Sequence, residues 1–191
     1  MDIEFIRIVK QYQQNIVLNE VSLSFREGCI NCLMGPSGIG KTTLINLLMG
    51  LDLPDSGEIR GIRDKRIAVV FQEDRLIEHW DAIENVKLIC DRTVSGEQVE
   101  QEFCKVDLTE YRNKPVRELS GGMRRRVAIV RAMLFPCDLV IMDEPFKGLD
   151  MELKQKLIAY VKEKTKGKTV IIVTHDKEEV RLLQANLVLL S

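Results

Sequence analysis

The sequence lacks the features that would place it in a membrane, outside the cell or on a nucleic acid. No stretch approaches the roughly eighteen uninterrupted apolar residues that a membrane-spanning helix needs. The N-terminus, MDIEFIRIVK, carries acidic side chains and no apolar core of a secretion signal. The formal net charge is only -1, so no basic field favours nucleic acid or an anionic membrane surface. These absences predict a cytoplasmic protein that does not bind nucleic acid.

A disulfide framework is also missing. The five cysteines are an odd number, and a chain of 191 residues can bury a core without cross-links. Cys29 and Cys32 form a C-x-x-C pair in the apolar run CINCLM, which we expect to be a buried strand. Residues three apart on a strand point to opposite faces, so the two sulfurs would diverge. We therefore interpret this pair as core cysteines, and the other three as packing residues.

What the sequence does contain is a pattern of apolar strands and helices. The segments FIRIVK and VSLSF alternate in polarity and predict an antiparallel β region near the N-terminus. Later strands are almost continuously apolar and alternate with helices, which is typical of a parallel sheet covered on both faces. We predict one domain over residues 1–191, with a core at about 1–72 and 137–191 and a helical insert at about 73–136.

The strongest motif lies between an expected strand and an expected helix. Residues 35–42, GPSGIGKT, fit G-x-x-x-x-G-K-[ST], a loop whose backbone N–H groups cradle phosphates. Lys41 would neutralise the β- and γ-phosphates, and the Thr42 hydroxyl would ligate Mg²⁺. The predicted nucleotide-binding residues here are Gly35, Pro36, Ser37, Gly38, Ile39, Gly40, Lys41, Thr42 and Thr43. The sequence therefore predicts that the protein binds ATP with Mg²⁺.

Polar residues follow the ends of three other apolar strands. Asp143 is expected to hold Mg²⁺, and Glu144 to polarise a water for attack on the γ-phosphate. His175 would touch the γ-phosphate or orient the water, and Gln72 would offer its amide oxygen to Mg²⁺ or water. Taken singly, each has a structural alternative: a carboxylate pair capping a turn, or a polar residue satisfied at a strand end. In a parallel sheet, however, these ends and the phosphate loop meet at one edge.

A second glycine turn, Ser120-Gly121-Gly122, precedes an expected helix and repeats the anion-binding design of the first. The alternative is an ordinary helix start with Ser120 as its N-cap. The three arginines that follow, Arg124, Arg125 and Arg126, are expected to form a solvated helix face, with Arg126 pairing with an acid.

Over nearly its full length the chain resembles the ATP-binding subunits of ABC transporters. The resemblance is carried by Tyr12, GPSGIGKTT, Gln72, LSGGM, LVIMDEP, GLD and His175, in family order. It implies an α/β fold: a P-loop NTPase (RecA-like) core with an N-terminal antiparallel β region and an inserted α-helical subdomain. It also implies an ATPase that forms a head-to-tail homodimer, or pairs with another ATPase, around two ATP molecules. Ser120, Gly121 and Gly122 would then meet the partner's nucleotide, Tyr12 would stack on the adenine, and Asp150 would signal across the dimer; Tyr12 alone also fits an edge-strand tyrosine.

The combination of LSGGM with DEPF resembles the nitrate, sulfonate and taurine importer group. It implies membrane-spanning permease subunits, a solute-binding protein, and a position on the inner face of the membrane. Trp80 and its neighbours would face the permease, although a core position for Trp80 is equally compatible. An ABC-type ATPase acting in cell division or membrane remodelling is the alternative, whereas a DNA-repair relative would need a long coiled coil.

Two residues depart from the family's usual signature: Met123 and Arg125 stand where glutamine is frequent. The chain also stops soon after His175 and a last apolar run, which predicts a member without an additional tail.

Overall fold

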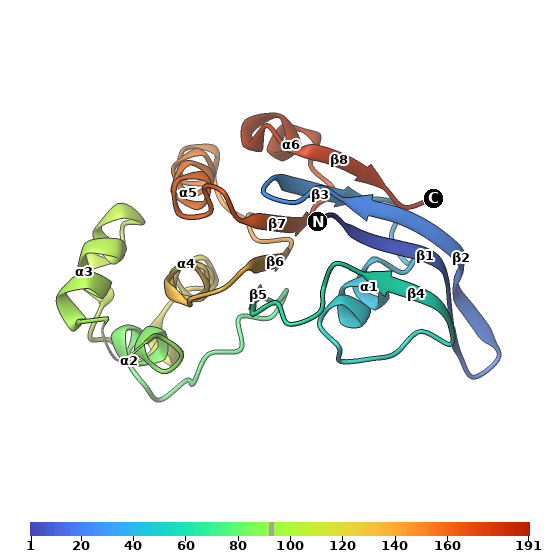
Figure 1. Ribbon diagram of the computed structural model, residues 1–191. Coiled ribbons are helices and arrows are strands. Elements are labelled where there is room, and N and C mark those ends of the chain that lie inside the picture. The colour runs from blue at the N-terminus through green and yellow to red at the C-terminus, as the bar shows by residue number, and fades with distance from the viewer. Residues whose placement is uncertain (92–93) are drawn as a thin grey trace.

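In the computed structural model, which describes residues 1–91 and 94–191, a five-stranded parallel sheet forms the centre of the molecule (Figure 1). Its strand order is β5-β6-β7-β3-β8, and every neighbouring pair runs parallel. The strands are β3 (Ile30–Met34), β5 (Ile67–Val70), β6 (Leu139–Asp143), β7 (Thr169–Val173) and β8 (Asn186–Leu189). A second sheet of order β2-β1-β4 is antiparallel and consists of β1 (Ile3–Tyr12), β2 (Asn15–Phe25) and β4 (Ser56–Arg60). The predicted fold class is confirmed.

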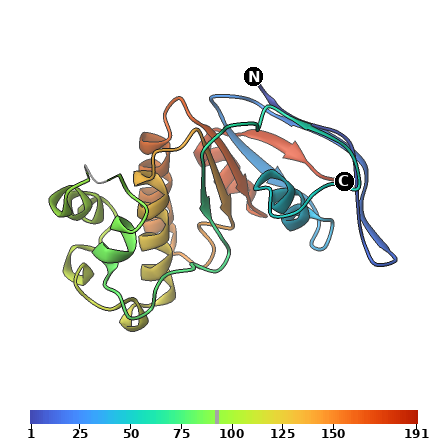
Figure 2. The ribbon, with the colours of Figure 1, turned by 60° about the horizontal axis from the view of Figure 1, so that its bottom comes forward.

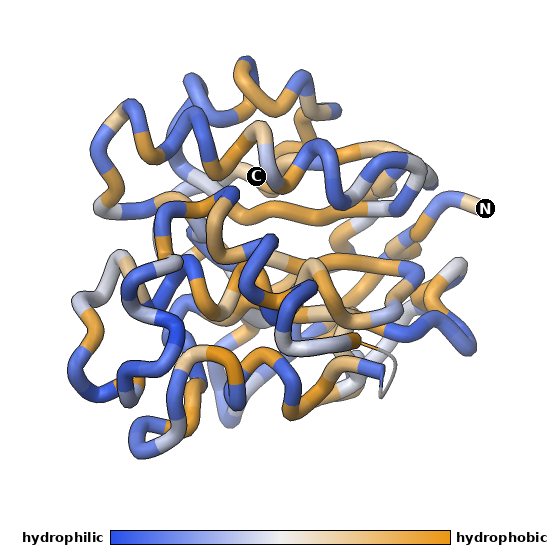
Figure 3. Tube along the Cα trace, turned by 90° about the vertical axis from the view of Figure 1, so that its left-hand side faces the viewer, coloured by the Kyte–Doolittle hydropathy of each residue, from blue (hydrophilic) through white to orange (hydrophobic). Residues whose placement is uncertain are grey.

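The pleat of the central strands divides the core into two layers. Along β6, Val140 and Met142 pack into one apolar cluster, whereas Leu139 and Ile141 pack into the other. Successive side chains of a strand point to opposite faces, so a strand buried on both sides must be apolar at every position. Figure 3 shows hydrophobic segments running through the middle of the trace. The unbroken apolar runs of the sequence have this origin.

Helices cover one face of the parallel sheet, and the antiparallel sheet covers the other with α1 between them (Figure 2). The first cluster joins the sheet to the helical half, and the second joins it to α1 and the antiparallel strands. The helices are α1 (Lys41–Leu48), α2 (Ala82–Lys87), α3 (Gly96–Lys105), α4 (Gly121–Leu134), α5 (Met151–Lys164) and α6 (Lys177–Leu183), with short 3₁₀ turns at Thr109–Tyr111 and Val116–Glu118. None of the described helices is long and apolar enough to cross a membrane.

The helical segment expected at 73–136 contains α2, α3 and α4, while residues 92–93 within it lie outside the described part of the chain. Val86, Phe103 and Val127 of these helices share one apolar cluster with Val140 of β6 and Leu157 of α5. The segment is therefore packed directly onto the sheet layer. The division into core and insert remains a prediction.

The cysteine prediction was partly wrong. Cys32 is fully buried on β3 as expected, but Cys29 precedes the strand and is exposed. Cys104, expected in packing, is also exposed because it lies on the outer face of α3. Cys90 is half-buried and Cys137 buried, and all five thiols are free. The strand begins one residue later than the apolar run suggested, so only one member of the pair enters the core.

Candidate active site

A cavity of about 290 Å³ opens at the carboxyl ends of the parallel strands. Five chain segments meet there: Val17 of β2, the loop after β3, the residues after β5, the end of β6 and the turn after β7. Its lining residues are Val17, Ser37, Gly38, Gly40, Lys41, Thr42, Thr43, Gln72, Asp143, Glu144, Val173 and His175. The structure thus brings together the phosphate-loop residues and the three strand ends. Gly35, Pro36 and Ile39 belong to the same loop but do not line this cavity.

The N-terminus of α1 points its free backbone N–H groups toward this loop. The helix starts at Lys41, its N-cap residue is Gly40, and no side chain caps it. No acidic residue lies in the first turn to neutralise the positive end of the helix. The first N–H groups of a helix have no partner within it, and an anion satisfies them well. This end of α1 therefore suits a phosphate.

Lys41 is held inside the loop. Its Nζ donates hydrogen bonds to the carbonyl oxygens of Gly35 and Pro36, both at 2.8 Å, and only 8% of the residue is exposed. Burial lowers the pKa of Lys41, while the nearby carboxylates Glu144 and Asp143 oppose that shift. A buried ammonium with carbonyl partners alone stands ready to exchange them for an anionic ligand.

Two glycines of the loop provide a matched test of its packing. Gly38 and Gly40 both have a positive φ, at 80° and 105°. A Cβ on Gly38 would meet nothing within 4 Å, whereas one on Gly40 would lie 2.7 Å from Leu18 Cδ2 and 3.2 Å from the Val17 carbonyl oxygen. We expect Gly38→Ala to lower the free energy of unfolding by about 1 kcal/mol, and Gly40→Ala by about 1 kcal/mol more. Urea unfolding of both variants measures the difference, and equal values would show that the loop is not constrained by β2.

The donors around Asp143 fit a hard cation. Asp143 lines the cavity together with Thr42 and Gln72, and the side chains of all three carry oxygen atoms of the kind Mg²⁺ prefers. Burial raises the pKa of Asp143, and the adjacent Glu144 raises it further. A bound cation would relieve both effects. Among the described residues, no group of three or more His, Cys, Asp or Glu side chains is arranged to hold a metal ion by itself. The set present therefore suits an ion that also keeps water or phosphate ligands, as Mg²⁺ does.

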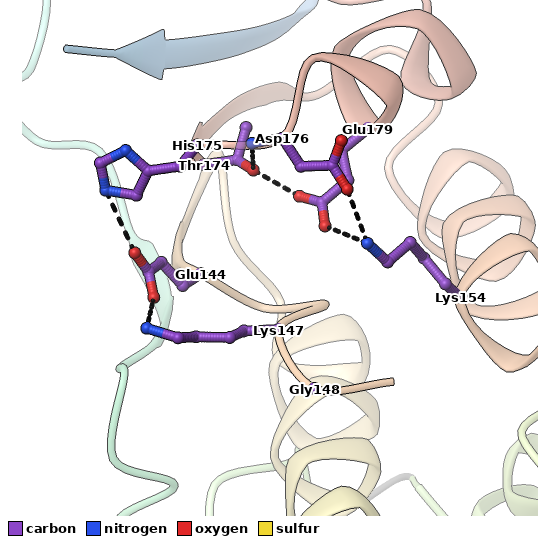
Figure 4. A pocket seen from close by; sticks show the side chains of 8 residues that line it. All are labelled: Glu144, Lys147, Gly148, Lys154, Thr174, His175, Asp176 and Glu179. Carbon is purple, nitrogen blue, oxygen red and sulfur yellow. Dashed lines mark hydrogen bonds and ion pairs between the residues drawn. The ribbon is translucent and has the colours of Figure 1, made fainter. Parts of the chain in front are cut away.

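Glu144 is held in an unusual conformation directly after β6. Its φ is 47°, in the left-handed region, and its N–H donates to the Val173 carbonyl oxygen at 3.0 Å. Its carboxylate contacts His175 Nε2 at 3.3 Å through one oxygen and Lys147 Nζ at 2.5 Å through the other (Figure 4). Non-glycine residues adopt this backbone at a cost of about 1–3 kcal/mol, and such residues cluster at functional sites. The strained backbone aims the carboxylate at the His175 turn.

The turn that carries His175 is fixed by a buried polar network. Thr174 donates its hydroxyl to Glu179 at 2.5 Å and accepts from the Asp176 N–H at 3.0 Å. Lys154 of α5 bridges Asp176 at 2.8 Å and Glu179 at 2.9 Å. These residues line a second cavity of about 380 Å³ next to Glu144, as Figure 4 shows. No pattern in the sequence indicated this network, although Thr174 and Asp176 flank His175.

Three groups of predicted site residues lie outside the main cavity. Tyr12, at the end of β1, is 42% exposed and donates its hydroxyl to Asp52 at 2.6 Å. Ser120 is exposed and caps α4, accepting a hydrogen bond from the Met123 N–H at 3.3 Å. Asp150 is exposed as well and caps α5, accepting from the Leu153 N–H at 2.9 Å. The N-cap alternative for Ser120 is therefore observed, and neither Ser120 nor Asp150 reaches the phosphate loop of its own chain.

The expectation of a solvated arginine face on α4 was wrong. Arg126 donates to the carbonyl oxygens of Gly122, Val106 and Asp107, and it forms no ion pair with any residue that the structure describes. Arg124 donates to the carbonyls of Leu119 and Arg117. The helix is packed on all sides. Its arginines therefore donate hydrogen bonds to neighbouring loops and do not face water.

The parallel sheet, the glycine loop before α1 and the acidic end of β6 define a P-loop NTPase fold. The chain belongs to the ABC transporter family, whose sequence profile matches residues 18–147. It is 33% identical to the sulfate/thiosulfate import ATP-binding protein CysA 1 of Agrobacterium fabrum, over 100% of this chain and 61% of that protein. It is 39% identical to the aliphatic sulfonates import ATP-binding protein SsuB 3 of Paraburkholderia xenovorans, over 91% of this chain and 70% of that one.

Solved structures agree in fold. The dimeric structure of MJ0796, a bacterial ABC transporter cassette, superposes with a TM-score of 0.85 at 30% identity, covering 98% of this chain and 94% of that chain. A post-hydrolysis state of the same cassette, bound to ADP and Pi, superposes with a TM-score of 0.84 at 28% identity. The match covers 99% of this chain and 94% of that chain. The chain spans about three-fifths of the length of several curated relatives, 61% and 59% in two cases.

Proposed function

We propose that this chain binds ATP with Mg²⁺, hydrolyses the ATP, and does so as the motor subunit of an ABC importer. One observation carries the proposal. The cavity joins the phosphate loop to Gln72, Asp143, Glu144 and His175, yet the second anion-binding turn at Ser120 is exposed and absent from it. A site with this second turn missing is completed most simply by another copy of the chain, rotated head to tail.

Each side chain has a role in the proposed reaction. Lys41 would release its two loop carbonyls and neutralise the β- and γ-phosphates. Thr42, Gln72 and Asp143 would hold Mg²⁺, which when bound offsets charge on the phosphate oxygens. Glu144 would accept a proton from the attacking water, and His175, 3.3 Å away, would fix the carboxylate and the water. Ser120, Gly121 and Gly122 of the partner would bind the γ-phosphate at the helix N-terminus.

Tyr12 and Asp150 would act around the phosphates. Lys10 and Tyr12 hold Asp52 through hydrogen bonds of 2.7 and 2.6 Å, and this lowers the pKa of Asp52 to about 2. The tyrosine ring is thereby fixed at the end of β1, where it would stack on the adenine. Asp150 starts α5, the helix that also carries Lys154 toward the His175 turn. A partner contact at Asp150 would therefore reach the His175 turn through α5 and Lys154.

Transport is favoured over cell division or membrane remodelling because the relatives described above are named as import proteins. We infer that permease subunits hold the chain at the inner face of the membrane, and that a solute-binding protein delivers a small solute or anion to them. The surface around Leu76, Ile77, His79 and Trp80 would contact the permease. Trp80 is half-buried, and its carbonyl accepts a hydrogen bond from the Val116 N–H at 2.9 Å.

A mixing experiment tests whether two copies complete each site. Lys41→Ala disables the phosphate loop, and Gly121→Asp places a repelling carboxylate at the second turn, where a Cβ meets nothing within 4 Å. Each variant alone should be inactive. Mixed in equal amounts, random pairing leaves about a quarter of all sites intact, because half of the dimers are mixed and each has one unaltered site. Phosphate release should recover to that level, and a mixture as inactive as its components would contradict the head-to-tail arrangement.

A further inference from the structure

The segment that carries Gln72 is held by the helix that carries Ser120. Arg125 of α4 donates from Nη1 to the Phe71 carbonyl oxygen at 2.5 Å and from Nη2 to the Gln72 carbonyl oxygen. Its Nε lies 3.2 Å from Asp74 Oδ1. The side chains of Arg125 and Asp74 are only 13% and 18% exposed. One arginine therefore contacts three residues of the segment that follows β5.

A second arginine of the same helix continues this contact. Arg131 donates to the carbonyl oxygens of Asp74 and Arg75, each at 3.0 Å. Together the two side chains engage four of the five carbonyls between positions 71 and 75. The strand β5 ends at Val70. Beyond it, where the chain turns toward the helical half, these carbonyls accept hydrogen bonds from α4 and no longer from a neighbouring strand. Figure 1 shows the chain leaving β5 beside α4.

The charges explain why the contact is specific to Arg125. Asp74 Oδ1 is buried without a hydrogen bond, and Arg125 Nε is its ion-pair partner. Burial raises the pKa of Asp74, and Arg125 is the first of the cations that oppose this. Glutamine, the frequent family residue at position 125, carries no charge to pair with Asp74. Its amide has two N–H donors, which are too few for Asp74 and both carbonyls. The substitution of arginine for the usual residue thus creates a contact that glutamine cannot make.

We propose that Arg125 is a positioning residue that fixes Gln72 to α4, so that the Gln72 amide and the Ser120 turn move as one body. Ser120 lies five residues before Arg125, at the N-terminus of the same helix. Binding of Mg²⁺ at Gln72 on one chain would then set the position of the turn that the same chain offers to its partner's nucleotide. The proposal rests on the proposed function, because it assigns Gln72 to Mg²⁺ and Ser120 to the partner site.

The test compares Arg125→Gln with Arg181→Gln. Arg181 lies on α6, and its side chain is 72% exposed and pairs with Glu178 alone among the described side chains, so it controls for loss of an arginine. Both changes are made in the Glu144→Gln background, and ATP-dependent dimerisation is followed by light scattering as Mg²⁺ is titrated. We expect Arg125→Gln to raise the half-saturating Mg²⁺ concentration about tenfold, the usual effect of losing a residue that orients a metal ligand. The half-saturating Mg²⁺ concentration of Arg125→Lys should lie between those of the parent and Arg125→Gln, and that of Arg181→Gln should equal the parent's.

A double-variant cycle separates positioning from general damage. If Arg125 acts through the Gln72 side chain, Arg125→Gln should have little further effect on Mg²⁺ saturation once Gln72 is alanine. Additive effects of the two changes, or equal saturation curves for Arg125→Gln and Arg181→Gln, would overturn the proposal. Failure of the Glu144→Gln background itself to dimerise with ATP would instead overturn the proposed function. Should Arg125→Gln prove poorly folded, the Arg125→Lys and Gln72→Ala pair completes the same cycle.

Discussion

Glu144→Gln is expected to reduce ATP turnover by about 10²–10⁴-fold, the usual contribution of a general base. Glutamine keeps the size of the side chain but cannot accept a proton from water. The amide can still contact His175 and Lys147, which lie 3.3 and 2.5 Å from the two carboxylate oxygens. ATP should therefore bind and close the dimer without being consumed. Phosphate release measures the first effect, and light scattering measures the second.

The matched control is Glu110→Gln, on an exposed 3₁₀ turn of the helical half. It removes one carboxylate without touching the cavity and should turn over at the parent rate. Dimerisation of Glu144→Gln should require ATP and fail with ADP, since in the proposed dimer only the triphosphate would reach the second turn. A glutamine variant that hydrolyses ATP at the parent rate would remove Glu144 from the mechanism.

Much of the site could be predicted because it follows from the order of strands. A parallel sheet brings the carboxyl ends of its strands to one edge, so Lys41, Gln72, Asp143 and His175 meet once the strands are recognised. The glycine loop is a local signal, since it needs only a few neighbouring residues and the helix behind them. The apolar strands and the glycine loop can each be recognised from a few consecutive residues.

The contacts that could not be predicted join residues distant in sequence. Nothing in the run of three arginines shows that Arg125 meets carbonyls 53 and 54 positions earlier. Cys104 is exposed because α3 buries Val99 and Phe103 against the neighbouring helices, and Cys104 lies outside that buried face. The left-handed φ of Glu144 comes from its tertiary hydrogen bond to Val173 of the neighbouring strand. Tertiary packing decides each of these, and local pattern does not.

Lys154→Met is expected to lower the free energy of unfolding by about 3 kcal/mol, because it leaves a buried carboxylate without its cation. Lys154 and Glu179 are 12% and 4% exposed, and among the described residues the Thr174 hydroxyl would be the remaining side-chain donor to Glu179. Lys156→Met is the control. It makes the same change two residues along α5 in an ion pair that is 44% and 55% exposed, and should cost less than about 1 kcal/mol.

The double variant Lys154→Met with Glu179→Gln should recover much of the loss, because no uncompensated charge then remains in the interior. The effect also has a pH signature. Burial opposes the charge of Lys154, but its bonds to Asp176 and Glu179 outweigh this and raise the pKa of Lys154 above 10.5. The hydrogen bond from Lys154 lowers the pKa of Asp176 below 3.8. A raised lysine pKa stabilises the fold at pH values below the pKa of that lysine in the unfolded chain. A lowered aspartate pKa stabilises the fold at pH values above the pKa of that aspartate in the unfolded chain.

Between pH 3.8 and pH 10.5, the free energy of unfolding of the parent should therefore exceed that of Lys154→Met by the full difference. The margin should shrink as the pH falls below 3.8, where Asp176 becomes protonated, and as it rises above 10.5, where Lys154 loses its proton. Denaturant unfolding of both proteins across this range measures it. If Lys154→Met cost no more than Lys156→Met, the polar network would not hold the His175 turn, and His175 would depend on Glu144 alone for its position.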